Sequence, residues 1–171
     1  MISVRAAVEA DVPEITEIQN ALIESTSYEW REDLHTVDAR LHWLDEKQRA
    51  GWPVLVAVDD ETDEVVGFAY YGDFRDSVRW PGYRTTVEHT IHVRGDQWGR
   101  GVGRHLLTEL EHRARSQGKH VMIGGIDATN EGSLLFHLRL GYEEVARMPA
   151  VGVKFGRWLD LVLVQKVLDD G

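Results

Sequence analysis

The chain contains no cysteine, which excludes disulfide bonds and thiolate chemistry of every kind. It has no apolar run near the roughly 20 residues that a membrane span needs, and its first residues show no signal-peptide pattern. Both absences fit a cytoplasmic protein, which is the location we expect. Positive charge is scarce, because 19 Lys and Arg face 29 Asp and Glu. The net charge of -10 argues against nucleic acid or an anionic membrane as the main partner.

The remaining composition is typical of a globular protein, with 43% hydrophobic and 28% charged residues. No internal repeat, low-complexity tract or long linker interrupts the sequence, so we expect a single domain over residues 1–171. Patterns of apolar residues predict strands at 2–6, 54–58, 65–71, 85–93, 121–126, 142–148 and 158–167. Helices are expected to begin at about residues 11, 36, 102 and 130, and the last three to end near residues 51, 118 and 141. This order predicts an α/β domain on a mixed sheet.

The expected helices have capping residues and buried stripes of the usual kinds. Asp11, Thr36 and Asn130 each have an oxygen that can cap the start of a helix. The stripes expected to face the core are Ile15, Ile18 and Leu22 in the first helix, Val102, Leu106, Leu107, Leu110 and Ala114 in the third, and Leu134 and Leu138 in the fourth.

The most informative segment joins the strand at 85–93 to the third helix and contains Gly99, Gly101 and Gly103. Glycine allows close approach of the backbone to a ligand and lets several N–H groups turn toward one point. A helix N-terminus adds partial positive charge there, and Arg100 and Arg104 add full charge with bidentate donors. The segment therefore predicts a phosphate-binding turn. A plain tight turn before a solvated helix start is the alternative.

The element order, with this turn between the fourth strand and the third helix, resembles the GNAT N-acetyltransferase family. The pyrophosphate signature of that family is Gln or Arg, two free positions, Gly, one free position, then Gly or Ala. Gly101 and Gly103 match its two small positions, whereas Trp98 stands where Gln or Arg is usual. The departure affects one side-chain contact and leaves the backbone of the turn intact.

A narrower resemblance covers almost the whole chain and points to the phosphinothricin acetyltransferase branch. It is similar above all to members that acetylate methionine sulfone and methionine sulfoximine. The motifs that carry it are Thr86-Val87-Glu88-His89-Thr90, Asn130-Glu131-Gly132-Ser133, His137-Leu138-Arg139-Leu140-Gly141-Tyr142 and, after Met148-Pro149, Lys154-Phe155-Gly156-Arg157-Trp158-Leu159-Asp160. The resemblance implies a mostly antiparallel, twisted GNAT sheet with helices on both faces. It also implies acetyl-CoA as donor, the α-amine of a small amino-acid analogue as acceptor, and a homodimer with the final strands and residues 154–160 near its interface.

Direct acetyl transfer in a ternary complex needs a base for the ammonium group, and Glu88 is the candidate. Its strand alternates, so Glu88 lies on the opposite face from Val87 and Ile91. A carboxylate partly shielded by apolar neighbours has a raised pKa, which suits a general base. The matching glutamate is catalytic in the resembling branch. The alternative is a structural carboxylate that pairs with Arg75 or Arg84.

The second catalytic candidate is His137, which lies about two helical turns after Asn130 on one face of the fourth helix. Asn130 matches a family position that contacts CoA, so His137 is expected in the same cleft as a proton relay or acid. An ordinary polar histidine is the alternative. By the same resemblance, backbone N–H groups of Ile91, His92 and Val93 polarise the thioester carbonyl. The CoA phosphates are expected over Gly99, Arg100, Gly101, Val102, Gly103 and Arg104.

The acceptor side is expected to include Arg75, which matches a substrate-contacting position and can bind a free carboxylate. Residues expected to line the pocket are Phe74, Tyr28, Trp30, Trp80, His89 and Thr90. Core or loop packing is the alternative for these aromatic rings. The loop at 76–83 is longer than in close relatives and bears on the choice of acceptor.

Three other functions compete with this one. A GNAT enzyme for another small amine, such as an aminoglycoside, polyamine or peptide N-terminus, would share the turn. A non-catalytic acyl-CoA sensor would also have the glycine turn. A nucleotide-binding module would use such a turn to bind a nucleotide instead of CoA. The turn lacks the Lys-Ser/Thr ending of a P-loop and the acidic residue expected after a dinucleotide turn. No His-Glu-x-x-His pattern occurs, so we expect no metal.

Overall fold

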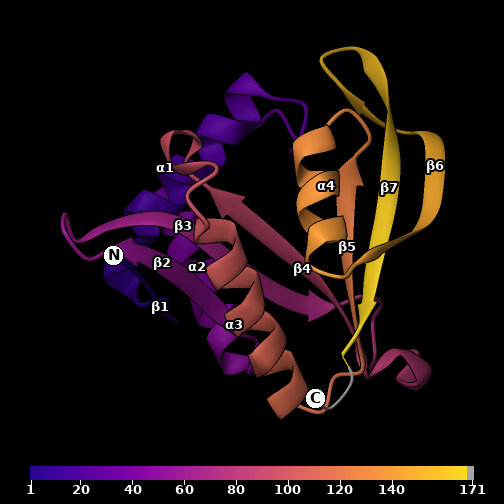
Figure 1. Ribbon diagram of the computed structural model, residues 1–171, viewed down its shortest axis with the longest axis horizontal. Coiled ribbons are helices and arrows are strands. Elements are labelled where there is room, and N and C mark those ends of the chain that lie inside the picture. The colour runs from indigo at the N-terminus through magenta and orange to yellow at the C-terminus, as the bar shows by residue number, and fades with distance from the viewer. Residues whose placement is uncertain (169–171) are drawn as a thin grey trace. The chain divides into compact units, whose positions relative to one another are not determined.

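The computed structural model describes residues 1–168, and the chain forms two compact units (Figure 1). Unit 1 contains residues 1–21, 35–72 and 90–113, and unit 2 contains residues 22–34, 73–89 and 114 onward. The expectation of a single domain stays a prediction. Among the described residues, no helix combines the length and the apolar character needed to cross a bilayer.

The observed elements follow the predicted order. The helices of residues 1–168 are α1 (Val12–Ser25), α2 (Val37–Arg49), α3 (Val102–Ser116) and α4 (Glu131–Arg139). The strands are β1 (Ile2–Ala6), β2 (Val54–Asp59), β3 (Glu64–Asp73), β4 (Thr86–Val93), β5 (Val121–Asp127), β6 (Glu143–Lys154) and β7 (Arg157–Val167). Short 3-10 turns lie at Glu9–Asp11, Pro81–Tyr83 and Gly95–Gln97.

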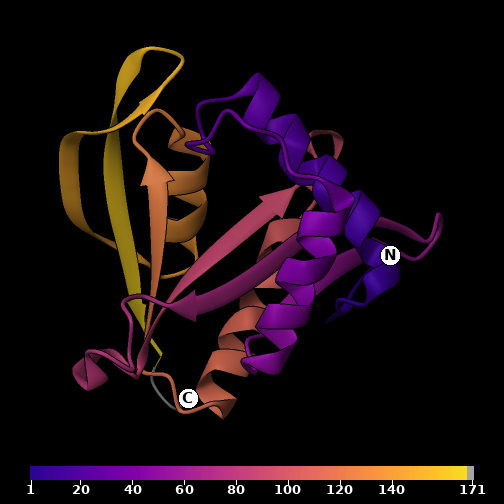
Figure 2. The same ribbon diagram turned by 180° about the vertical axis from the view of Figure 1, so that it is seen from behind.

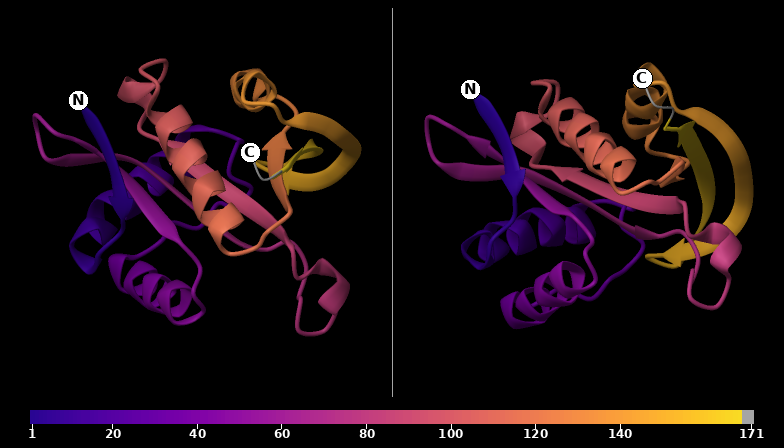
Figure 3. Two further views of the ribbon diagram at one scale, coloured as in Figure 1. Left: turned by 60° about the horizontal axis from the view of Figure 1, so that its bottom comes forward. Right: turned by 90° about the horizontal axis from the view of Figure 1, so that it is seen from below.

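Unit 1 contains β1, β2, β3 and the end of β4, in that order in the sheet. β1 pairs antiparallel with β2, and β2 pairs antiparallel with β3. Helices α1 and α2 cover one face of β2 and β3, and α3 covers the other (Figures 1 and 3). The predicted stripe of α3 is buried, and it meets β3 at Gly67. A Cβ atom on Gly67 would lie 3.1 Å from Leu106 and 3.3 Å from Val102, so this glycine allows close packing.

Unit 2 contains the start of β4, followed in the sheet by β5, β7 and β6. β4 runs parallel to β5 from Thr86 beside Val121 to His89 beside Gly124, and the other two pairs are antiparallel. Helix α4 lies along one face of β5 (Figures 1 and 2). The seven strands of residues 1–168 thus form the mixed, mostly antiparallel sheet that was predicted.

Three local predictions about the helices were wrong. Asp11 precedes α1, but its carboxylate accepts hydrogen bonds from the Val8 N–H and from Arg5 behind it, instead of capping the helix ahead. Leu22 is half-buried, and its neighbour Ile23 is the buried residue. In α4, Leu138 is 42% exposed, whereas the adjacent His137 is only 2% exposed. A polar side chain therefore takes the inward position, because it has a partner there.

Candidate active site

The predicted phosphate-binding turn lies in unit 1 and has the backbone that the glycines suggested. Gly99 and Gly101 have φ angles of 77° and 84°, in the left-handed region that side chains with a Cβ atom rarely adopt. A Cβ atom on either residue would meet no atom within 4 Å, so the space beside the turn is open. α3 begins at Val102, and its first N–H groups have no partner within the helix. These features fit the binding of a phosphate group.

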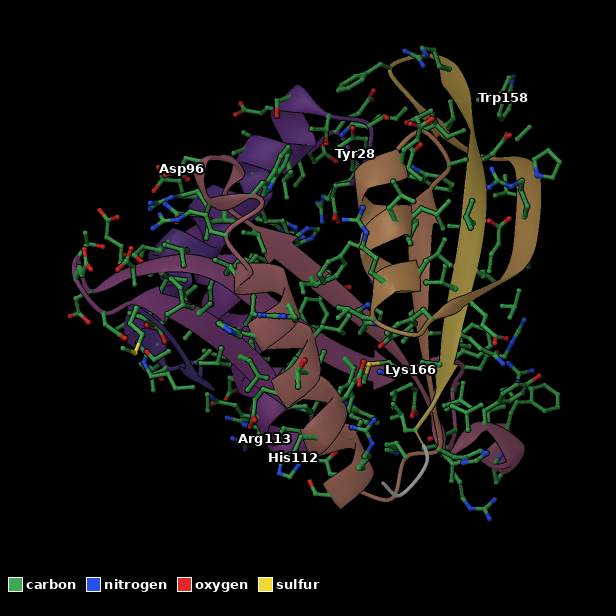
Figure 4. The ribbon with its side chains drawn as sticks, viewed as in Figure 1. Tyr28, Asp96, His112, Arg113, Trp158 and Lys166 are labelled. Carbon is green, nitrogen blue, oxygen red and sulfur yellow. The ribbon has the colours of Figure 1, made fainter. Side chains whose placement is uncertain are left out.

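A chain of side-chain hydrogen bonds supports this turn. Arg100 Nη1 donates to Gln97 Oε1 at 2.6 Å, and Gln97 Nε2 donates to Asp96 Oδ2 at 3.0 Å. Asp96, labelled in Figure 4, also accepts from Arg94, which reaches Glu64 as well. Arg100 is therefore engaged with its own turn, whereas Arg104 is exposed and available to a ligand.

Trp98, the departure from the family signature, is also engaged by the turn. Its indole Nε1–H donates to the carbonyl of Val93 at 2.8 Å, and the side chain is 58% exposed. The tryptophan thus ties the turn to the end of β4 and leaves the glycine backbone unchanged. Along the same strand, Thr90, Ile91, His92 and Val93 are half-buried, and the parallel pairing of β4 with β5 covers Thr86 to His89.

Glu88 lies in unit 2, where β4 places its carboxylate over a glycine of β5. Its Oε1 atom lies 3.3 Å from the point that a Cβ atom on Gly125 would occupy. The side chains of Leu161 and Leu163 on β7 lie 3.5 and 3.9 Å from the same point. Glu88 still reaches solvent, but the surrounding protein desolvates the carboxyl and raises its pKa above the ordinary value. The direction is the one that a general base needs.

His89 and His137 form a buried pair in unit 2. Their Nε2 atoms lie 2.9 Å apart, and His137 Nδ1 lies 2.7 Å from the carbonyl of Ser133. A carbonyl only accepts, so His137 carries its proton on Nδ1 and accepts at Nε2 from the Nε2–H of His89. Burial, and then the neighbouring His137, lowers the pKa of His89 to about 3. His89 is therefore neutral at physiological pH.

The two predicted catalytic side chains lie on opposite faces of the unit 2 sheet. The ring of His89 faces Gly124, with Cε1 2.8 Å from the position of a Cβ atom there, and Glu88 faces the next residue, Gly125. Adjacent residues of a strand point to opposite faces. Since His137 bonds to His89, it lies on the face away from the Glu88 carboxylate. His137 was expected in the cleft of Asn130, and its side chain is 98% covered by protein. Its catalytic role stays a prediction.

Asn130 caps α4 as predicted, because its side-chain oxygen accepts from the Ser133 N–H at 3.1 Å. Its backbone N–H donates to the carbonyl of Asp127 at the end of β5. The Asp127 carboxylate accepts from the N–H and hydroxyl groups of Thr129, so the approach to α4 is fixed.

The predicted acceptor residues Arg75, Phe74 and Tyr28 all belong to unit 2. The Arg75 guanidinium is exposed and lies over the rings of Phe74 and Tyr83, 5.5 and 5.7 Å from their centroids. Tyr28 is 39% exposed, and Trp80 is 56% exposed. The two rings give Arg75 a cation–π environment. Within residues 1–168, no hydrogen bond or ion pair joins Arg75 to Glu88, which argues against the alternative of a structural ion pair between them.

Sequence reasoning missed Gly125, whose lack of a side chain makes room for the Glu88 carboxylate. The signal was available, because adjacent glycines inside an apolar strand mark close approach of another group. Among residues 1–168, no group of three or more His, Asp or Glu side chains is placed to hold a metal ion.

Comparison with known proteins identifies the family of the chain. Residues 15–142 match the sequence model of the acetyltransferase (GNAT) family. The chain belongs to that family. In this GNAT protein the glycine turn lies between β4 and α3, and the fold is that of a solved GNAT-superfamily structure.

Three relatives of this GNAT protein are informative. It is 46% identical over 98% of its length to the L-methionine sulfoximine/L-methionine sulfone acetyltransferase of Pseudomonas aeruginosa, of which it covers 95%. It is 31% identical over 98% of its length to a phosphinothricin N-acetyltransferase of Streptomyces coelicolor, of which it covers 96%. The structure of yncA from Salmonella typhimurium with its cofactor acetyl-CoA has a TM-score of 0.91 at 42% identity, covering 99% of this chain and 95% of that one.

Proposed function

We propose that the chain is an acetyl-CoA-dependent N-acetyltransferase. Its proposed acceptor is the α-amine of a small amino-acid analogue of the methionine sulfone, methionine sulfoximine or phosphinothricin type. The observation that carries the proposal is the 46% identity, over nearly the whole of both chains, to an enzyme named for two of these substrates. The open glycine turn and the desolvated Glu88 carboxylate provide independent chemical support.

In this proposal Glu88 takes a proton from the acceptor ammonium group, directly or through water. The freed amine nitrogen attacks the carbonyl carbon of the thioester, a C–N bond forms, the C–S bond breaks and the CoA thiolate leaves and is protonated. Backbone N–H groups of Ile91, His92 and Val93 are proposed to polarise the carbonyl oxygen, which typically contributes a rate factor of about 10²–10³. The raised pKa of Glu88 favours proton uptake near neutral pH.

Binding of the two substrates is proposed to use different residues. The N–H groups of residues 99–104 and Asn130 hold acetyl-CoA, whereas Arg75 binds the acceptor carboxylate. Phe74, Tyr28 and Thr90 line the acceptor pocket. His137 is proposed to act through His89. The hydrogen bond between the two histidines holds α4 against β4, and His89 is the residue next to Glu88 in that strand. Since acetyl-CoA is an intracellular metabolite, we also propose that the protein acts in the cytoplasm.

The absence of cysteine allows a direct test of the reaction. A thiol-reactive chromophore detects released CoA with no background from the protein itself. The purified protein is incubated with acetyl-CoA and methionine sulfone, methionine sulfoximine, phosphinothricin or spermidine. We expect turnover of at least one amino-acid analogue at a much higher kcat/KM than spermidine. Turnover of spermidine alone contradicts the acceptor class, and acetyl-CoA binding without CoA release across the panel points to a sensor.

We also propose a homodimer, supported by the apolar outer surface of the β6–β7 hairpin. β6 ends the strand order of the sheet, and its exposed apolar residues are Val145, Met148, Val151 and Val153. Trp158 on β7 is 74% exposed and points away from the hairpin (Figure 4). An exposed apolar edge strand invites pairing with a second copy. Light scattering after size-exclusion chromatography is expected to give twice the chain mass, and W158E is expected to shift it to one chain mass.

A further inference from the structure

A buried lysine side chain binds backbone carbonyl groups of the segment Leu22–Leu34 in unit 2. Lys154 is 2% exposed, and its Nζ donates to the carbonyls of Ile23, Thr26 and Glu29 at 2.6, 2.7 and 2.7 Å. An ammonium group has three N–H donors, so these three carbonyls use all of them. Lysine is almost never fully buried without partners. We refer to this ammonium and its three carbonyls as the Lys154 clamp.

The same segment has two further anchors. The Trp30 indole Nε1–H donates to Asp127 Oδ2 at 3.0 Å. Its ring lies against Gly152, where a Cβ atom would be 2.3 Å from two ring carbons. Beyond Trp30, the Glu32 carboxylate accepts from the Phe155 N–H at 2.8 Å. Leu22–Leu34 is therefore fixed to β5, β6 and the turn before β7.

These anchors place the segment on the face of the unit 2 sheet that carries the Glu88 carboxylate. Gly125 lies under that carboxylate, and Asp127 is two residues further along β5, so its side chain is on the same face. The distance along a strand is about 7 Å for two residues. Since Trp30 bonds to Asp127, the indole covers this face next to Glu88.

We propose that Lys154 is a positioning residue for the acceptor. Its clamp holds Leu22–Leu34, which carries Tyr28, over the Glu88 face and so shapes the acceptor side of the site. The inference rests on the proposed function, which assigns the acceptor to Glu88. Lys154 contacts backbone carbonyls of the segment, so it acts through that segment. Loss of the clamp releases the acceptor side and leaves the residues 99–104, assigned to acetyl-CoA, unchanged.

The test compares Lys154→Met with Lys166→Met. Lys166, on β7 and labelled in Figure 4, is a matched control, because its Nζ also donates to a carbonyl, that of Leu140, at 2.8 Å. For Lys154→Met we expect the KM of methionine sulfone to rise about tenfold or more, with the KM of acetyl-CoA changed less than about twofold. Hydrogen exchange within residues 22–34 is expected to speed up. Lys166→Met is expected to change none of these.

A second pair of variants keeps the inference testable if Lys154→Met does not fold. Trp30→Phe keeps a ring over Gly152 and removes the bond to Asp127, and a smaller rise in acceptor KM of the same kind is expected. The variant Lys154→Cys, alkylated with bromoethylamine in the unfolded chain and then refolded, has an ammonium group again at this position. The alkylation is selective because the chain has no other cysteine. This product is expected to recover the acceptor KM.

Three results would overturn the inference. If Lys154→Met speeds up hydrogen exchange in residues 22–34 but leaves the acceptor KM unchanged, the Lys154 clamp stabilises the segment without positioning the acceptor. Equal rises in both KM values would mean general damage, as would failure of the restored ammonium to recover the acceptor KM. Failure of the wild-type protein to acetylate any amino-acid analogue refutes the proposed function instead, and the KM comparison is then made with whichever amine of the panel is acetylated.

Discussion

Replacing Gly152 by alanine is expected to break the contact between Trp30 and the β6–β7 hairpin. The new Cβ atom would lie 2.3 Å from two carbons of the Trp30 ring, whereas ordinary contact begins at 3.4 Å. The ring belongs to a rigid indole, so it must move away by roughly 1 Å, the gap between overlap and ordinary contact. Its hydrogen bond to Asp127, at 3.0 Å, is then stretched or lost.

The size of the effect follows from these two losses. Overpacking costs about 1–3 kcal/mol, and a hydrogen bond to a charged group contributes about 1.5–3 kcal/mol. In the opposite direction, alanine has less conformational freedom than glycine in the unfolded chain, which stabilises the folded state by about 0.4–1 kcal/mol. We expect the free energy of unfolding to fall by about 1.5–5.5 kcal/mol, the net of these terms.

Guanidinium unfolding followed by circular dichroism measures this change. Gly82→Ala is the control, because a Cβ atom on Gly82 would meet no atom within 4 Å, and we expect a change within about 0.5 kcal/mol there. A loss below about 1 kcal/mol for Gly152→Ala would refute the steric reasoning, since overpacking alone should exceed it. A large loss for Gly82→Ala would show that glycine replacement in general, and not the Trp30 contact, is responsible.

Four further outcomes are expected. Glu88→Gln should lower kcat by about 10²-fold or more, and a loss under about threefold would make Glu88 structural. Because the folded pKa of Glu88 is raised, its ionisation costs stability as pH rises above its unfolded value near 4.5, so Glu88→Gln should raise the Tm at pH 7 and not at pH 3.5. Arg75→Ala should raise the acceptor KM and keep that of acetyl-CoA, whereas the reverse pattern would put Arg75 at the donor end. Because the pKa of His89 is lowered to about 3 from 6.5, wild-type stability should fall as pH drops through this window, and His89→Asn should show a shallower fall in acid titrations.

Much of the fold could be predicted from local pattern. The stripe of α3 repeats every three to four residues, and all of its predicted members are buried. The strand positions followed from alternation and apolar runs, although β6 extends to Lys154 instead of ending near residue 148. Antiparallel pairing with β7 explains this extension. The pairing continues beyond a register irregularity between Met148 and Gly152 and reaches Lys154. No local pattern contains that information.

The candidate site was predictable only in part. The positive φ angles at Gly99 and Gly101 follow from residue type, because glycine adopts them without steric cost. The inward face of α4 was predicted wrongly, since a leucine has a stronger apolar signal than a histidine. His137 is buried because His89, 48 residues earlier, supplies its hydrogen-bond partner. Only contact between distant parts of the chain could reveal that pair, and with it the separation of Glu88 and His137 onto opposite faces.

The order of elements, the glycine turn and the family resemblance were all determined by the amino-acid sequence alone, because they depend on residues close together in the chain. Tertiary structure alone decided which polar groups are buried. Lys154 would be taken for a solvated side chain by its type, yet it meets the carbonyl of Ile23, 131 residues away. A buried charge is stable only where several partners surround it, and such a set is assembled by folding.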